Sequence, residues 1–96
     1  MHQRIVPGNV AAPAGAYSHG ISTHGPGTCL HVAGQIGVTP EGRLLEGFEA
    51  QADQAWKNLV AVLQAAGMDA SHLVKVTTYL TRAADLPRLN AIRSVY

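Results

Sequence analysis

The sequence is poor in charged residues and in aromatic rings. Of its 96 residues only 14% are charged and 5% are aromatic, whereas about 25% of the residues in ordinary soluble domains are charged. Seven Lys and Arg against six Asp and Glu leave a formal net charge of +1. This balance argues against a nucleic-acid partner, because no basic cluster could neutralise a run of phosphates. The low charge predicts either that a partner covers much of the surface or that the chain is incomplete.

Cysteine and long apolar runs are also scarce. The single cysteine, Cys29, can form neither an internal disulfide nor a multi-cysteine metal site, which is typical of a reducing compartment. No basic segment leads into an apolar stretch at the N-terminus, and no run approaches the roughly 18 apolar residues of a membrane span. We therefore expect a cytoplasmic protein without a membrane partner, forming a single domain over residues 1–96.

Two segments alternate between apolar residues and polar or small ones, as strands with one buried face do. They span residues 28–38 and 74–81. Weaker signals predict an edge strand near residues 4–6 and a strand over 17–23. The run His-Gly-Pro-Gly at 24–27 predicts a turn between two strands.

Helical spacing replaces this alternation elsewhere in the chain. From Phe48 to Ala66 apolar residues recur every three or four positions, and Gly67 predicts the helix end. A second helix is expected from Asp85, with Pro87 in its first turn. Its apolar stripe continues to the last residue without a stop signal, so the pattern predicts a chain that ends inside a helix and inside an unfinished sheet.

The polar residues give few independent functional signals. Five histidines show no metal-ligand spacing, and we predict no metal site. Cys29 and His31 share a strand face and could form a thiolate–imidazole pair, although a small buried thiol is the commoner case. Asn90 could be a solvated side chain or a functional amide, and Tyr17 could be an edge-strand aromatic or a site residue.

Six segments have an order and spacing that are jointly specific: residues 15–20 (GAYSHG), 30–38 (LHVAGQIGV), 51–59 (QADQAWKNL), 65–67 (AAG), 73–80 (LVKVTTYL) and 89–90 (LN). Together they resemble the RidA (YjgF) family of reactive-intermediate deaminases. The resemblance implies a chorismate-mutase-like α+β fold, with a mixed sheet backed by two helices on one side. It also implies homotrimers with clefts between subunits, and hydrolysis of enamines and imines such as 2-aminoacrylate to 2-oxo acids and ammonia, without a cofactor.

The resemblance also assigns residues. Tyr17, Gly34 and Asn90 match family positions that line the substrate cleft. The arginine that clamps the substrate carboxylate and the glutamate that handles water lie, in the family, on two strands after the second helix. Those positions fall beyond Tyr96, and Arg93 does not match the arginine motif. The catalytic residues therefore remain unidentified, and we expect a C-terminally incomplete domain.

Two other functions stay open at this point. The same fold could serve as a non-catalytic trimer that binds a small metabolite or regulates a partner, because clefts between subunits suit small molecules. Ribonuclease activity is ascribed to some members of the family that the chain resembles. The neutral charge and the lack of an aromatic–basic stripe argue against that activity here.

Overall fold

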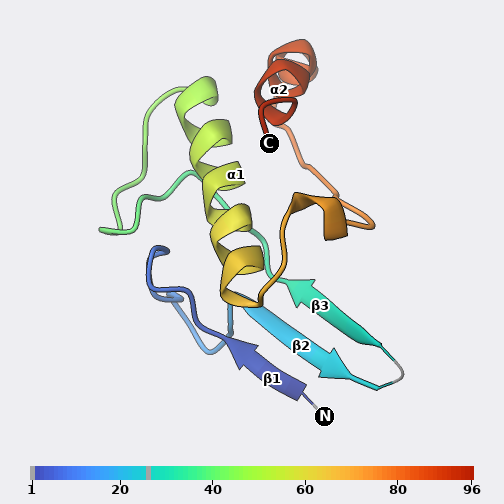
Figure 1. Cartoon of the computed structure of the whole chain (residues 1–96). Coiled ribbons are helices and arrows are strands. Elements are labelled where there is room, and N and C mark those ends of the chain that lie inside the picture. Colours follow the sequence, from blue (N-terminus) through green and yellow to red (C-terminus); the bar gives the residue numbers. More distant parts are fainter. Residues whose placement is uncertain (1, 26) are drawn as a thin grey trace.

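The computed structural model describes residues 2–25 and 27–96 and has an α+β fold (Figure 1). A small sheet lies at one end of a long helix, and a second, shorter helix packs beside that helix. The regular elements are β1 (His2–Ile5), β2 (Gly20–His24), β3 (Thr28–Val32), α1 (Phe48–Ala65) and α2 (Leu86–Arg93). Along the chain, two short 3-10 helices connect α1 to α2, at Ala70–His72 and Ala83–Asp85.

The three strands form one antiparallel sheet in the order β1-β2-β3. Ile5 pairs with Gly20, and Gly20 pairs with Val32. The expected α+β class is confirmed, but the described strands contain no parallel pair, so the expected mixed sheet is reduced to its antiparallel part. The predicted turn at 24–27 includes Pro26, which lies outside the described residues.

The first helix, α1, confirms the prediction from the apolar spacing. It runs from Phe48 to Ala65, and Gly67 follows with a positive φ of 74°. The Gly67 N–H donates to the Gln64 carbonyl at 3.0 Å, and the Met68 N–H donates to the Leu63 carbonyl at 2.8 Å. This pair of bonds is a Schellman motif, which glycine favours because it adopts the left-handed conformation without a Cβ penalty.

The core is small and centres on the C-terminal half of α1. Val62 is fully buried and packs over Gly20 of β2. Two of its neighbours on α1, together with residues from the sheet, the β1–β2 loop and α2, complete the core. These are Ala61, Leu63, Ile5, Val10 and Leu89.

Helix α2 packs along α1 rather than over the strands (Figure 1), so only α1 backs the described sheet. The Arg88 guanidinium binds the Glu49 carboxylate at 2.6 Å and the Asp85 carboxylate at 3.0 Å. The Trp56 ring stacks on the Tyr96 ring, with 6.0 Å between the ring centroids. The prediction of a helix to the last residue is wrong: α2 ends at Arg93, because the chain then turns to bring Tyr96 back onto α1.

Both alternating segments contain less strand than predicted. Strand β3 stops at Val32, and Ile36, expected on the buried face, is 64% exposed. The predicted strand over 74–81 is wrong, because residues 73–80 have no strand partner among the described residues. Val74 is 99% exposed. A strand needs a neighbouring backbone for its hydrogen bonds, and side-chain alternation cannot supply one.

No helix in the described part of the chain is both long enough and apolar enough to cross a bilayer.

Candidate functional site

A polar cluster joins the loop before β2 to the segment after β3. It centres on the His19 ring and includes Ala11, Tyr17, Ala33 and Gln35; we call it the His19 cluster. The His19 carbonyl accepts the Ala33 N–H at 2.9 Å, which extends the β2–β3 contact by one bond. The Tyr17 ring meets the His19 ring edge-on, with 6.2 Å between centroids. The backbone at 17–19 is thereby held against the backbone at 33–35.

The hydrogen bonds of His19 define its tautomer. Its Nε2 lies 2.6 Å from the Ala11 carbonyl oxygen, which can only accept, so Nε2 carries the hydrogen. Its Nδ1 lies 3.2 Å from Nε2 of Gln35, and the same amide nitrogen donates to the Ala33 carbonyl at 3.2 Å. An amide nitrogen only donates, so Nδ1 accepts in this arrangement.

Two of the three predicted binding residues lie at this cluster. Tyr17 is 49% exposed, and its hydroxyl accepts the Ala14 N–H at 3.5 Å. Gly34 lies between two members of the cluster and is exposed. A Cβ placed on Gly34 would meet nothing within 4 Å, which leaves open space beside its backbone.

The third predicted residue lies elsewhere. Asn90 is exposed on α2, and Figure 1 shows α2 well away from the start of β2, where Tyr17 lies close in sequence. One copy of the chain therefore does not bring the Asn90 side chain to the His19 cluster. The roles of Tyr17, Gly34 and Asn90 in binding stay predictions.

Three amides on one face of α1 fix the segment that follows Gly34. Asn58, only 3% exposed, donates through Nδ2 to the carbonyls of Ile36 at 3.1 Å and Val38 at 2.9 Å. Its Oδ1 accepts from Gln54 at 2.9 Å. The Gln51 amide donates to the Leu45 carbonyl at 2.7 Å. These bonds satisfy the buried Asn58 side chain and anchor the chain after Gly34 to the helix.

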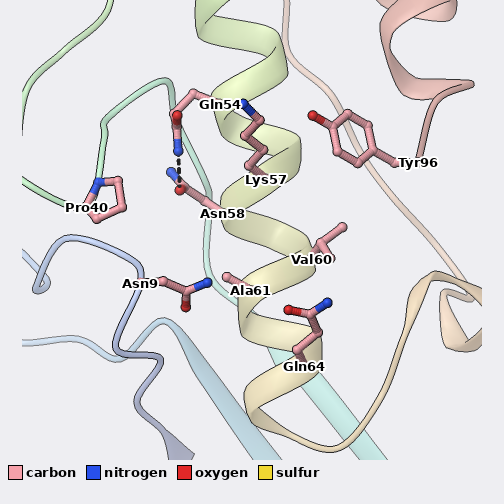
Figure 2. A pocket seen from close by; sticks show the side chains of 9 residues that line it. All are labelled: Asn9, Pro40, Gln54, Lys57, Asn58, Val60, Ala61, Gln64 and Tyr96. Atoms are coloured by element: carbon pink, nitrogen blue, oxygen red, sulfur yellow. Dashed lines mark hydrogen bonds between the residues drawn. The ribbon is translucent and has the colours of Figure 1, made fainter.

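A hollow of about 420 Å³ lies beside α1 and is bordered by Asn9, Pro40 and Tyr96 (Figure 2). Figure 2 shows the side chains of Asn9 and Gln64 on its border, with the ammonium group of Lys57 farther along the helix. A second hollow of about 450 Å³ lies between the sheet and the end of α1. Neither hollow is lined by Tyr17, Gly34 or Asn90, so neither supports the predicted binding residues.

The largest shift of a pKa lies beside the first hollow. The Tyr96 hydroxyl donates to the Asp53 carboxylate. Burial and this bond raise the pKa of Tyr96 to about 12. The same bond, followed by the ammonium of Lys57, which lies 3.2 Å away, lowers the pKa of Asp53. This network ties Tyr96 to α1.

The thiol–imidazole hypothesis finds only partial support. Cys29 and His31 lie on the same face of β3, opposite Thr23 and Ile21 of β2. Cys29 is exposed, so the expectation of a buried thiol is wrong for this chain. Among the residues that the structure describes, no three His, Cys, Asp or Glu side chains gather closely enough to hold a metal ion.

Sequence reasoning missed three residues that organise the site. His19, Gln35 and Asn58 are not among the predicted site residues. A signal for Asn58 was present, because Gln51, Gln54 and Asn58 recur at spacings of three and four residues. Such a stripe of amides on one helix face indicates side chains that could bind a neighbouring backbone as readily as water.

Comparison with known proteins identifies related chains. The family model described as Endoribonuclease L-PSP matches residues 8–96. A RutC family protein of Aquifex aeolicus is 41% identical over 85 residues, which cover 88% of this chain and 66% of the relative. The rat protein named 2-iminobutanoate/2-iminopropanoate deaminase is 40% identical over 89 residues, covering 88% of this chain and 63% of the relative. The chain thus spans just under two thirds of the length of these relatives.

Solved structures share the fold. RidA from the Antarctic bacterium Psychrobacter has a TM-score of 0.86 at 34% identity, with 97% of this chain and 74% of that chain covered. The Rid family protein YyfA of Yersinia pestis has a TM-score of 0.92 at 33% identity, covering 100% of this chain and 75% of that one.

Proposed function

This chain belongs to the RidA (YjgF) family, and from that premise we propose that the protein containing it hydrolyses reactive enamines and imines to 2-oxo acids and ammonia. The deaminase name carried by the rat relative and by the Salmonella typhimurium relative, which is 33% identical, supports this substrate class.

The proposed reaction is a hydrolysis in which atoms and charge balance. An enamine such as 2-aminoacrylate first takes a proton on its terminal carbon and releases one from its nitrogen, which gives the imine. Water then adds to the imine carbon, and one of its protons moves to nitrogen. The remaining hydroxyl proton moves to nitrogen as the carbon–nitrogen bond breaks, so that ammonia leaves and the carbonyl of the 2-oxo acid forms. The chain's part in this reaction is to hold the substrate in place, which accelerates the attack of water by fixing its geometry.

The observation that carries the proposal is the His19 cluster. It holds the backbone beside Tyr17 against the backbone beside Gly34, and both residues are predicted to bind substrate. Asn90 lies apart from them on α2. We therefore propose that the binding crevice forms between copies of the chain in a homotrimer, with Tyr17 and Gly34 from one copy and Asn90 from its neighbour.

The test is ammonia release from freshly generated 2-iminobutanoate. We expect the folded protein that contains this chain to accelerate the release well above the rate in buffer, with 2-oxobutanoate formed in equal amount. Circular dichroism and size-exclusion chromatography establish that the sample is folded and trimeric. No acceleration by a folded trimer would refute the deaminase proposal.

Two alternatives give different results in the same set of measurements. Saturable binding of 2-oxobutanoate without ammonia release would indicate the non-catalytic metabolite-binding trimer. Binding of single-stranded RNA that weakens steeply with salt would indicate ribonuclease function. The charge balance disfavours RNA binding, because seven Lys and Arg are offset by six Asp and Glu.

A further inference from the structure

His19 links the loop before β2, which contains Tyr17, to the segment after β3, which contains Gly34. Its carbonyl accepts the Ala33 N–H, and its ring accepts from Gln35 while donating to Ala11. The ring is half-buried and lies edge-on to the ring of Tyr17. Three separate stretches of chain, at residues 11, 17–19 and 33–35, therefore meet at one imidazole.

We propose that His19 is a positioning residue that sets the spacing between Tyr17 and Gly34 in the substrate crevice. This inference rests on the proposed function, because it assigns His19 a role in the site where the imine would bind. The residue acts through its neighbours: Gln35 bridges the ring to the Ala33 carbonyl, so a shift of the imidazole moves the backbone on both sides of Gly34.

The hydrogen bonds argue against a catalytic role for the imidazole itself. Nε2 is occupied by the Ala11 carbonyl at 2.6 Å, and Nδ1 is occupied by the Gln35 amide at 3.2 Å. A general acid or base needs a nitrogen within hydrogen-bond reach of the substrate or of its water. In this arrangement neither nitrogen is available, because each already has a protein partner.

A positioning role and a catalytic role for His19 predict different effects of substitution. Glutamine offers one donor and one acceptor at the end of its side chain, so His19→Gln can keep both bonds while losing the imidazole. Phenylalanine keeps an aromatic ring against Tyr17 and loses both bonds. A positioning role therefore predicts that His19→Gln is close to wild type and that His19→Phe is impaired.

The experiment measures kinetics and backbone exchange on the full protein. We expect His19→Phe to lower kcat/KM for 2-iminobutanoate about tenfold, mostly through KM, since misplaced binding groups weaken substrate capture. His19→Gln should stay within about twofold of wild type with the same pH profile of kcat. The matched control, His2→Phe, loses one exposed bond to Thr23 and should leave both parameters unchanged.

Hydrogen exchange at Tyr17 and Ala33 supplies a readout that does not depend on catalysis. We expect faster exchange of both amides in His19→Phe and wild-type exchange in His19→Gln. Should His19→Phe fail to fold, Gln35→Leu is expected to give the same pattern in exchange and in KM, because it removes the Nδ1 partner of His19 and the bond to the Ala33 carbonyl while leaving the imidazole in place.

Three results would overturn the inference. One is a His19→Gln variant that loses kcat and changes its pH profile, because the imidazole would then act directly. The second is a folded His19→Phe variant with wild-type kinetics and exchange. The third is Gln35→Leu with wild-type exchange at Ala33. A wild-type protein without deaminase activity would refute the proposed function alone, since the exchange measurements still test the spacing.

Discussion

Gly37 and Gln51 lie so close together that a Cβ on Gly37 would fall 2.5 Å from the Gln51 Cα and 2.6 Å from its Cβ. Gly37 is buried and lies between the two carbonyls that Asn58 binds. The missing side chain therefore allows the segment after Gly34 to approach α1 closely enough for both hydrogen bonds to form. The glycine at position 37 therefore helps to hold the segment after Gly34 in place against α1.

The first prediction concerns Gly37→Ala. The added methyl group meets helix backbone, which cannot move aside, so we expect a loss of about 2–3 kcal/mol in the free energy of unfolding. Urea denaturation followed by Trp56 fluorescence measures it. Gly34→Ala is the matched control, because a Cβ there meets nothing within 4 Å, and its stability should change by less than about 0.5 kcal/mol. Equal stability of the two variants would contradict the close packing.

Asn58→Leu gives the second prediction. The substitution leaves the carbonyls of Ile36 and Val38 and the Gln54 amide without their partner, and buried polar groups without partners are costly. We expect a loss of about 3 kcal/mol. Gln64→Leu, at an exposed amide on the same helix, should cost less than about 0.5 kcal/mol. A small effect at position 58 would mean that water replaces the amide there.

The third prediction is an alkaline limit set by Tyr96. Its pKa is raised from the ordinary 10.0 to about 12 in the folded protein, so its neutral form contributes stability below pH 10 that is lost as pH rises through 12. A tyrosinate stacked on Trp56 quenches indole emission. We expect a fluorescence decrease centred near pH 12 that Tyr96→Phe abolishes. A decrease of the same size in Tyr96→Phe would contradict the assignment.

Local signals in the sequence were sufficient for helix α1 and its C-terminal end. The apolar spacing and Gly67 predicted α1 and its end, because a helix and its cap depend on neighbours a few residues away. The structure also contains a turn at 39–42 that needs no distant partner, in which the Gly42 N–H donates to the Thr39 carbonyl at 2.8 Å. The family and its fold were predicted from six short segments. Their order and spacing together are specific, although no single segment is.

Features that depend on distant partners could not be predicted in the same way. Alternation over 74–81 satisfies the pattern for a strand, but pairing requires a second backbone that the local sequence does not specify. An amide on a helix ordinarily faces water, whereas Asn58 binds two carbonyls from 20 and 22 residues earlier. The role of His19 likewise depends on Ala11 and Gln35, which become its neighbours only after folding.

The central claim is that two copies of the chain build one crevice for imine hydrolysis, and co-expression of two variants tests it most directly. Tyr17→Ala and Asn90→Ala, both at exposed side chains, should each keep the stability of the wild type and lose most ammonia release from 2-iminobutanoate. Random mixing of the two variants in trimers leaves about one crevice in four with both residues intact. We predict recovery of about a quarter of wild-type activity. No recovery in mixed trimers, or full activity of either variant alone, would contradict the account.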